Sequence, residues 1–332
     1  MNRGYFDILK SFPGYQDSEK YWHTTIDRSD FFWYDLVVDS PGGYYSKDAI
    51  KKYLDDFRKQ VEFVNKKRFI YLFTSRKKVR FDTTKQPRFT MFGNKLVINL
   101  LIGSGEKRKI IRSFPKGERP KVCVDSKFIY FKGSSYSTIC TVHDFLRLNN
   151  IPLGLTSEVH YVGLTEDPAQ RTLSREHRGY ADMLYFVPTS ENDFFLTVNT
   201  CKVLSHAHLR NSMLNIVSTN SMIDDIPLSE EGSIIEKAMI HYFDTKCQEI
   251  GKKRDWGEFR NLLRETMRAK NINSLSMHIE MNNPSEYDIL GSRKVEPSLS
   301  HSFAWVLEND EPKLIKFESE MDILNYHSDF FE

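Results

Sequence analysis

Arg171 and Arg175 are the residues of this sequence whose type and spacing most suggest chemistry. They lie four positions apart in a stretch with helical signals. On a helix they would share a face and repel each other by about 0.2–0.5 kcal/mol. A face that tolerates this repulsion is suited to binding an anion, such as a phosphate group.

The elements expected around these arginines are a strand followed by a helix. Residues Val159–Gly163 alternate β-branched and aromatic side chains with others, which favours a half-buried strand. Asp167 is a good N-cap, and Pro168 has its φ preset for the first helical position. We therefore expect a helix that begins at residue 168 and runs to about His177, before Gly179 ends it.

Glu236 is the second residue with chemical potential. It is expected on a helix over residues 233–243, at the edge of an apolar stripe. A carboxylate there must be paired, hydrated or bound to a cation, because burying it alone is costly. Mg²⁺ (or Mn²⁺) suits one carboxylate together with waters and a substrate phosphate. The alternative is a salt bridge from Glu236 to a lysine or arginine of the neighbouring sheet.

Together these residues resemble the second half of the GIY-YIG nuclease signature. The matching parts are Tyr161-Val162-Gly163, Arg171 eight positions after the glycine, His177 near the end of the helix, and a downstream helix that presents Glu236. The resemblance covers roughly residues 126–255, a little over a third of the chain. Gln248 stands about where family members often place an asparagine.

The family also carries an earlier tyrosine strand that lies beside the Tyr161 strand, usually some ten residues upstream. In this sequence that distance falls on residues 149–151, and residues 138–148 resemble a short helix instead. The first tyrosine therefore comes from a longer excursion, with Tyr130 or Tyr136 as candidates, or it is absent. This departure bears on catalysis more than on fold. The alternative for Tyr161 itself is an ordinary, half-buried strand tyrosine.

The resemblance implies a role for each residue. A metal ion at Glu236 would polarise a phosphodiester oxygen and stabilise the leaving alkoxide. Arg171, with Arg175, would neutralise charge on the non-bridging oxygens in the transition state. Tyr161 would orient or deprotonate the attacking water, which requires neighbouring cations to lower its pKa from about 10. His177 would assist through a hydrogen bond to water or phosphate.

Positive charge is concentrated between Lys51 and Lys121. This segment has 21 Lys and Arg against 6 Asp and Glu, in a chain whose net charge is +2. Such asymmetry is expected of a protein that binds the phosphate backbone, although lysines and arginines also simply solvate exposed faces. The residues predicted to contact nucleic acid are Lys107, Arg108, Lys109, Arg112 and Arg175.

The predicted fold class is α+β, with three parts along 332 residues. Residues 1–125 are expected to form a basic, β-rich nucleic-acid-binding domain. Residues 126–255 are expected to form a GIY-YIG-like module, a small mixed or antiparallel sheet flanked by helices. Residues 256–332 would add an α/β extension. Within the middle part, strands are expected at residues 183–187 and 194–198.

Composition argues against several other classes of protein. The longest strongly apolar run, residues 96–102, is far too short to span a bilayer, so no membrane association and a cytoplasmic location are expected. The cysteines form no C-x-x-C pair, which argues against a zinc knuckle or disulfide framework. From Glu280 onward 12 acids face 4 bases. This acidic region could pack against the basic half or bind a partner protein or a second copy of the chain.

The sequence therefore predicts a metal-dependent endonuclease that hydrolyses phosphodiester bonds of DNA, possible roles being restriction or phage defence. A nucleic-acid-binding protein whose GIY-YIG-like module has lost cleavage is the alternative, because the earlier tyrosine is not evident. A structural or partner-binding protein is the third hypothesis.

Overall fold

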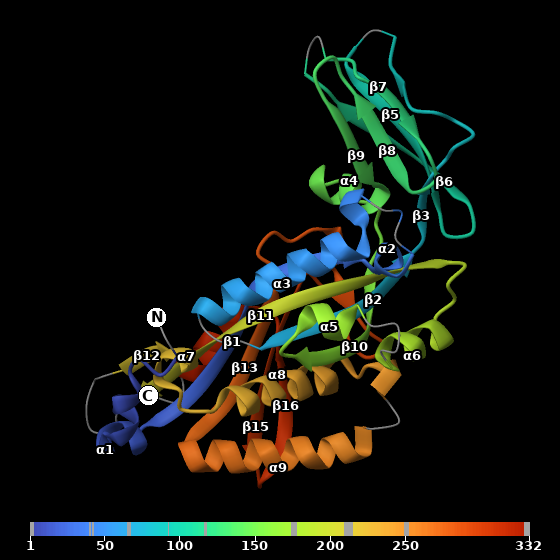
Figure 1. The fold of residues 1–332 in the computed structure, drawn as a ribbon. Coiled ribbons are helices and arrows are strands. Elements are labelled where there is room, and N and C mark those ends of the chain that lie inside the picture. Colours follow the sequence, from blue (N-terminus) through green and yellow to red (C-terminus); the bar gives the residue numbers. More distant parts are fainter. Residues whose placement is uncertain are drawn as a thin grey trace.

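A nine-stranded sheet forms the body of the molecule (Figure 1). Its main order is β14-β10-β2-β11-β1-β13-β15-β16, and β12 pairs with β11. Neighbouring strands are antiparallel except β1 with β13 and β10 with β14. The bounds are β1 (Glu19–Trp33), β2 (Phe69–Lys77), β10 (Ser157–Thr165), β11 (Asn192–His208), β12 (Asn215–Thr219), β13 (Ile272–Glu280), β14 (Leu290–Gly291), β15 (Ser300–Glu308) and β16 (Glu311–Phe317).

The computed structural model describes most of the chain. The described residues are 3–39, 41, 43–64, 68–91, 93–115, 118–173, 178–208, 215–248 and 252–328. None of the helices within these residues is both long and apolar enough to cross a membrane.

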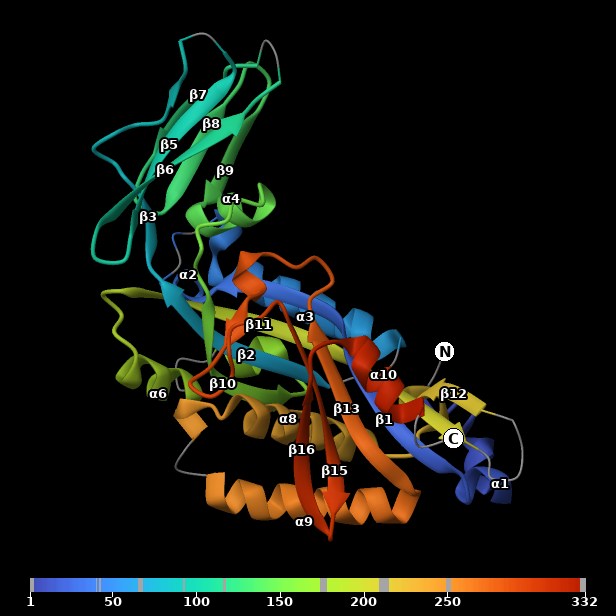
Figure 2. The same cartoon turned by 180° about the vertical axis from the view of Figure 1, so that it is seen from behind.

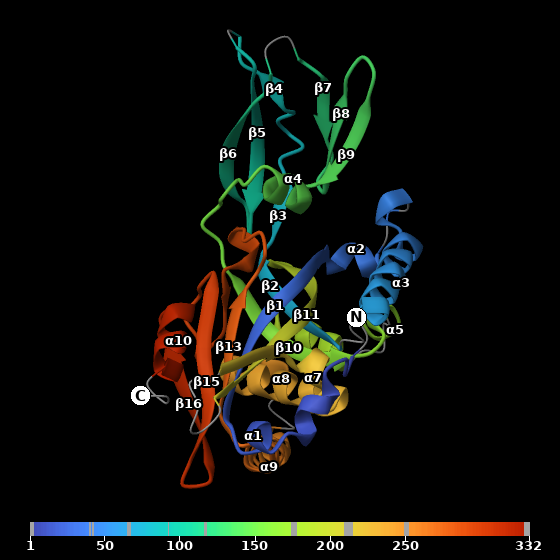
Figure 3. The same ribbon diagram turned by 90° about the vertical axis from the view of Figure 1, so that its left-hand side faces the viewer.

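Helices cover both faces of the sheet, and strand β2 shows why. Phe69, Tyr71 and Phe73 point to one face and join a core with α2 (Tyr34–Val38), α3 (Lys47–Val64), α5 (Pro168–Thr172) and α6 (Arg178–Phe186). Ile70 and Leu72 point to the other face and pack under α8 (Leu228–Phe243) and α9 (Lys252–Lys270). Alternate residues of a strand face opposite sides, so a strand covered on both sides is apolar throughout. Figure 3 shows the two layers from the side.

A separate β-rich unit stands at one end of the sheet, between β2 and β10 in the sequence (Figures 1 and 2). We call residues 79–148 the β module. One sheet contains β3 (Val79–Phe81), β4 (Arg88–Phe89), β5 (Lys95–Ile102) and β6 (Glu106–Ser113), and the other contains β7 (Lys121–Val124), β8 (Phe128–Lys132) and β9 (Ser137–Thr141). Helix α4 (Val142–Leu148) closes its base, and the core it helps to form includes Leu96, Ile98 and Ile129.

Short helices complete the chain. They are η1 (Asp7–Ser11), α1 (Pro13–Gln16), η2 (Gly43–Tyr45), α7 (Asn220–Ile223), η3 (Lys246–Gln248), η4 (Glu286–Asp288) and α10 (Glu320–Ser328). Helix α10 is attached to the sheet by His327, whose ring hydrogen-bonds the hydroxyls of Ser274 and Ser276 at 3.1 Å each.

The α+β class is confirmed, but the predicted division at residues 125/126 and 255/256 does not follow the structure. The nine-stranded sheet takes strands from all three predicted parts, and β11 lies between β2 and β1. Hydrophobic periodicity indicates where strands occur but not which strands pair, because pairing depends on contacts far apart in the sequence.

Local predictions around the arginine helix are mixed. Asp167 caps α5 as expected, since its carboxylate accepts a hydrogen bond from the Gln170 amide at 2.8 Å. Helix α5 ends at Thr172. The strand expected at residues 183–187 is wrong, because these residues fall largely within α6, whose Tyr180 and Met183 are buried on one helical face. The strand expected at 194–198 lies within the longer β11.

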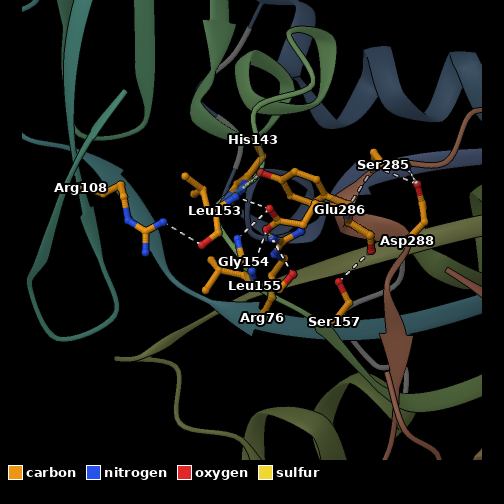
Figure 4. A network of polar contacts seen from close by, with 11 residues as sticks. Arg76, Arg108, His143, Leu153, Gly154, Leu155, Ser157, Ser285, Glu286 and Asp288 are labelled. Atoms are coloured by element: carbon orange, nitrogen blue, oxygen red, sulfur yellow. Dashed lines mark hydrogen bonds and ion pairs between the residues drawn. The ribbon is translucent and has the colours of Figure 1, made fainter. Parts of the chain in front are cut away.

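One carboxylate, Glu286, holds the chain where it returns from the β module to the sheet (Figure 4). It accepts hydrogen bonds from three consecutive backbone amides, those of Leu153, Gly154 (3.0 Å) and Leu155 (2.9 Å). The same carboxylate pairs with Arg76 at the end of β2. Both side chains are nearly inaccessible, 1% exposed for Arg76 and 9% for Glu286. The return path is therefore fixed by a buried, charge-assisted network.

A second carboxylate, Asp193 of β11, fixes the chain where it leaves β2 and enters the β module. It accepts hydrogen bonds from the Val79 amide at 2.9 Å, from Arg80 at 2.8 Å and from His143 Nε2 at 2.9 Å. Burial alone would raise the pKa of Asp193, but the contacts with His143 and Arg80 lower it below its usual range. Asp193 and Glu286 thus anchor both ends of the β module to the body.

We expect the substitution Glu286→Ala to lower the free energy of unfolding by about 2–4 kcal/mol, because three amides and a buried guanidinium lose their acceptor. Urea denaturation measures the change. Glu318→Ala, at an exposed position, is the control and should alter stability by less than about 0.5 kcal/mol. Equal stability of the two variants would contradict the anchoring role.

Candidate functional site

The strand that lies beside the Tyr161 strand is β2, and its tyrosine is Tyr71. Strands β2 and β10 are antiparallel, with Gly163 opposite Tyr71 and Tyr161 opposite Phe73. On its other side β2 pairs with β11, also antiparallel. The three strands therefore form an antiparallel unit in which both tyrosines occupy adjacent strands.

The two candidates named from the sequence, Tyr130 and Tyr136, are wrong. Tyr130 lies on β8, where its hydroxyl donates to Asp125 at 2.6 Å, and Tyr136 directly precedes β9. Both belong to the β module and neither lies on a strand that pairs with β10. Tyr71 was missed because the β module separates it from Tyr161 by 90 positions. The run Phe69-Ile70-Tyr71 was the available signal.

Tyr71, Tyr161 and Arg171 form one polar cluster on the face covered by α5. The two phenol rings stack with centroids 5.9 Å apart and planes inclined by 23°. Polar interaction with both phenols, mainly with that of Tyr71, raises the pKa of the Arg171 guanidinium. The electrostatic interaction of Arg171 with Tyr161 agrees with the predicted proximity, and Tyr71 is the third member of the cluster.

Helix α5 is fixed at both ends, which positions Arg171. At its start Arg58 of α3 forms an ion pair with the capping residue Asp167. At its end the Tyr34 hydroxyl donates to the carbonyl oxygen of Thr172 at 2.6 Å. A guanidinium held by a short helix of five residues would otherwise sample several positions.

Two glycines make room for the tyrosine rings. A Cβ atom on Gly163 would lie 2.3 Å from the Tyr71 ring, and one on Gly179 would lie 2.4 Å from the Tyr161 ring. Both distances are impossible for real atoms, so a larger residue would displace the ring. The glycine of the Tyr-Val-Gly triplet is therefore required by the neighbouring strand's tyrosine.

The phenols are not activated as bases. Burial raises the pKa of Tyr71 and of Tyr161 above their usual value, and the neighbouring Arg171 only partly offsets this. A base role for Tyr161 requires neighbouring cations to lower its pKa, and the effect of Arg171 is outweighed by burial. Tyr71 is 1% exposed and Tyr161 is half-buried, whereas Arg171 is exposed. An incoming phosphate would meet Arg171 first, and the phenols would act as hydrogen-bond donors.

Glu236 lies at the edge of the sheet. Its helix α8 covers the face opposite α5, but the carboxylate reaches β10, where Oε1 accepts from the Leu164 amide at 2.8 Å. Nearby, the Gln248 side chain accepts from the Val162 amide at 3.1 Å and donates to the Val162 carbonyl at 2.9 Å. Thr245 donates to the same Gln248 oxygen at 2.6 Å.

The charge of Glu236 interacts with the tyrosine cluster. Burial raises the pKa of this carboxyl, while the Leu164 amide, Lys237 and Arg171 act in the opposite direction. Conversely, Glu236 contributes to the raised pKa of Tyr161. The three residues predicted to meet are therefore neighbours electrostatically, although α5 and α8 approach them from opposite faces.

Glu236 fits a cation only as a single carboxylate. Within the described residues it makes no ion pair, so the predicted alternative of a salt bridge to the sheet does not apply there. Its half-buried position penalises the charged form, which a bound cation would favour. The described ranges contain no group of three or more His, Cys, Asp or Glu arranged to hold a metal. Mg²⁺ would therefore need waters and phosphate as its other ligands.

Two predicted site residues, Arg175 and His177, fall in residues 174–177 and so lie outside the described residues.

The cations predicted on strand β6 divide between its two faces. Lys107 and Lys109 lie opposite Leu101 and Asn99, whereas Arg108 and Arg112 lie opposite the buried residues Leu100 and Leu96. Residues directly opposite in a sheet share a face, so Lys107 and Lys109 lie on one face, called the outward face, and Arg108 and Arg112 lie on the face that carries Leu96 and Leu100. All four side chains are exposed.

Arg108 is occupied by contacts within the protein. It donates to the Leu153 carbonyl at 3.1 Å and pairs with Glu106 at 3.2 Å. The outward face instead gathers the exposed side chains of Lys107, Lys109, Lys95 on β5 and Arg88 on β4, opposite Val97. This face, rather than all four predicted residues, is the candidate surface for a phosphate backbone.

Acidic residues near the C-terminus have partners on α9. Arg268 pairs with Asp310, and Arg260 and Arg264 contact Glu311 at 3.2 and 3.4 Å. Part of the acidic region is thus neutralised within the chain.

Comparisons with known proteins identify no relative: no family model, no curated protein and no solved structure matches the chain. The geometry of the site is therefore the basis for any functional proposal.

We expect Gly163→Ala to destabilise the protein by about 1–3 kcal/mol, because the added methyl must displace the packed Tyr71 ring. Gly257→Ala is the matched control, since its Cβ would meet no atom within 4 Å and alanine favours the surrounding helix α9. Urea unfolding of both variants tests the idea. It fails if Gly163→Ala is as stable as Gly257→Ala.

Proposed function

We propose that this chain is a metal-dependent endonuclease that hydrolyses phosphodiester bonds of DNA. The observation that carries the proposal is the Tyr71–Tyr161–Arg171 cluster on adjacent antiparallel strands, with Glu236 at the edge of the same strand β10. The order β10–β2–β11, with the arginine helix between β10 and β11 and the glutamate helix after β11, resembles the GIY-YIG arrangement. Such an activity would serve in restriction or phage defence.

Each residue has a task that its environment supports. Exposed Arg171 binds the non-bridging oxygens of the scissile phosphate and stabilises their charge in the transition state. Tyr161 remains protonated, so it donates a hydrogen bond to the phosphate or to the attacking water. Buried Tyr71 positions Arg171 and Tyr161 instead of contacting the substrate. Glu236 would hold Mg²⁺ or Mn²⁺, which when bound supplies Lewis-acid stabilisation of the leaving oxygen.

The outward face of the β module would hold the duplex. Lys95, Lys107, Lys109 and Arg88 are exposed there, and none of them shares the face with an acidic residue among the described strand partners. Neutralising phosphates with such cations gives sequence-independent, salt-dependent binding.

A binding protein without cleavage is the second candidate. The specific observations in its favour are the raised pKa values of both phenols and the single carboxylate available to a metal. In that case the basic face would bind nucleic acid while the tyrosine cluster served only as structure.

Cleavage of supercoiled plasmid in Mg²⁺ should fall at least about 100-fold in Glu236→Gln and in Arg171→Ala, because each removes charge stabilisation of the transition state. Duplex binding, measured by fluorescence anisotropy, should change little in Glu236→Gln and by no more than the loss of one phosphate contact in Arg171→Ala. Glu158→Gln, an exposed glutamate on the same strand β10, is the matched control and should cleave normally. Wild-type protein that binds DNA but never cuts it would favour the binding-only candidate instead.

The double substitution Lys107→Ala/Lys109→Ala should weaken duplex binding and reduce the slope of log K against log salt by about 2, because each lost phosphate contact contributes about 0.9. Arg112→Ala, on the same strand but the opposite face, is the control and should leave the slope unchanged. Anisotropy titrations between about 50 and 200 mM salt measure both slopes. Equal slopes for both variants would rule out the outward face as the DNA surface.

A further inference from the structure

A pocket lined by aromatic rings lies where the body meets the β module. Its volume is about 360 Å³, and its lining includes Phe32, Trp33, Tyr45, Tyr53 and Asp144. The aromatic residues come from β1, η2 and α3, whereas Asp144 comes from α4 of the β module. Pockets of about 300–1,000 Å³ between structural units are the usual sites of small-molecule and cofactor binding.

The walls of the pocket present flat aromatic surfaces to a ligand. Tyr53 is 43% exposed, and Phe32 meets it edge to face with ring centroids 5.9 Å apart. Tyr45 on the other side rests on Phe128 at 5.4 Å, so its position is supported from behind. Stacking on such rings stabilises a bound base by about 1–3 kcal/mol and tolerates any base, since each has a π-face.

Cations stand beside this aromatic lining. The Arg147 guanidinium lies 4.3 Å from the centroid of Phe31, and Lys127 Nζ lies 5.8 Å from that of Trp33. Both aromatic residues are among those that line the pocket. Neither cation has a carboxylate partner within the part of the chain that the structure describes. Aromatic rings with adjacent unpaired cations match a base and the phosphate attached to it.

Asp144 adds a hydrogen-bond acceptor to the lining. Its carboxylate accepts the Thr141 hydroxyl at 2.8 Å and also interacts with the Tyr45 hydroxyl in the pocket wall. A carboxylate has about four acceptor sites, so sites remain for a donor in the pocket. Adenine, cytosine and guanine all carry amino groups that can donate to a carboxylate. The pocket therefore offers stacking, an acceptor and positive charge.

Helix α3 connects this pocket with the tyrosine cluster. Tyr53, near its start, lines the pocket, and Arg58, five residues later, pairs with the cap of the arginine helix. Five residues of helix rise by about 7.5 Å. Phe32 and Ile50 of the pocket belong to the same core as the tyrosine cluster, whereas Trp33 and Leu36 of the pocket belong to the core of the β module.

We propose that this pocket binds a nucleobase together with its adjacent phosphate. The base stacks on Tyr53 and Phe32, an amino group of the base donates to Asp144, and Arg147 and Lys127 hold the phosphate. Where the ligand is a base extruded from a DNA strand, the proposal rests on the proposed function; a free mononucleotide presents the same chemistry and does not require it.

Photolabelling identifies the site and its source of ligand. Glu236→Gln protein, in which cleavage cannot interfere, is irradiated with 8-azido-AMP or with a single-stranded oligonucleotide containing 8-azidoadenine. Label on peptides that carry Tyr53 or Phe32 is the expected result. Labelling by the oligonucleotide that excess AMP does not displace indicates an extruded base, whereas labelling by 8-azido-AMP alone indicates a free nucleotide. Label confined to other peptides overturns the proposal.

Calorimetric titration with AMP and adenosine tests the assigned contacts. Tyr53→Ala should weaken both ligands at least about 10-fold, whereas Tyr53→Phe keeps the ring and should bind normally. Arg147→Ala should weaken AMP but not adenosine, because adenosine lacks the phosphate. Tyr185→Ala, an 85% exposed aromatic on α6, is the control. Unchanged AMP affinity in Tyr53→Ala overturns the proposal.

The two proposals fail separately. A wild-type protein that never cuts DNA but labels in the pocket with 8-azido-AMP supports the nucleobase site and contradicts the nuclease. A protein that cuts DNA but takes no label at Tyr53 or Phe32 contradicts the nucleobase site and leaves the nuclease standing.

Discussion

The antiparallel pairing of β2 with β10 is the interaction on which the rest of the structure depends. It places Gly163 opposite Tyr71 and so brings both phenols within reach of one guanidinium. The pairing costs conformational entropy, because the chain must form the whole β module between the two strands and then bring β10 back beside β2. The two anchors at its base, Asp193 and Glu286, hold the outgoing and returning paths and make that return specific.

Electrostatics within the cluster follow from its depth in the sheet. Burial dominates the pKa of each phenol, so Arg171 serves the tyrosines as a hydrogen-bond partner and does not convert them into bases. Glu236 experiences the same burial from the edge of the sheet. In the proposed function, this arrangement would place a preorganised cation where charge develops on a bound phosphate.

Local sequence signals predicted the short-range features of the site but not its long-range partner. The cap at Asp167, the strand containing Tyr161 and the helix bearing Glu236 could be predicted, because each depends on neighbours within a few residues. Tyr71 could not be assigned, because only strand pairing places it beside Tyr161. Helix α6 was mistaken for a strand, since its apolar residues near Met183 are compatible with either period over so short a length.

The division of the basic segment has the same explanation. Lys107 and Arg108 are adjacent in sequence and equally charged, yet the register of β6 against β5 sends them to opposite faces. A count of charges treats both residues as available to bind phosphate, whereas in the fold Arg108 donates a hydrogen bond to the Leu153 carbonyl. The domain boundaries failed because the sheet is assembled from segments on both sides of the β module.

The amide of Gln248 has a consequence for association between molecules. Among the described residues, strand β10 is bordered on its outer side only by the two-residue strand β14, so the backbone around Val162 would otherwise be an open sheet edge. By satisfying both the Val162 amide and its carbonyl, Gln248 imitates one rung of a neighbouring strand, and Glu236 takes the next amide at Leu164. Open sheet edges can pair with a strand of another molecule and lead to aggregation. By occupying the edge amides and carbonyl of β10, these two side chains prevent such pairing at this position.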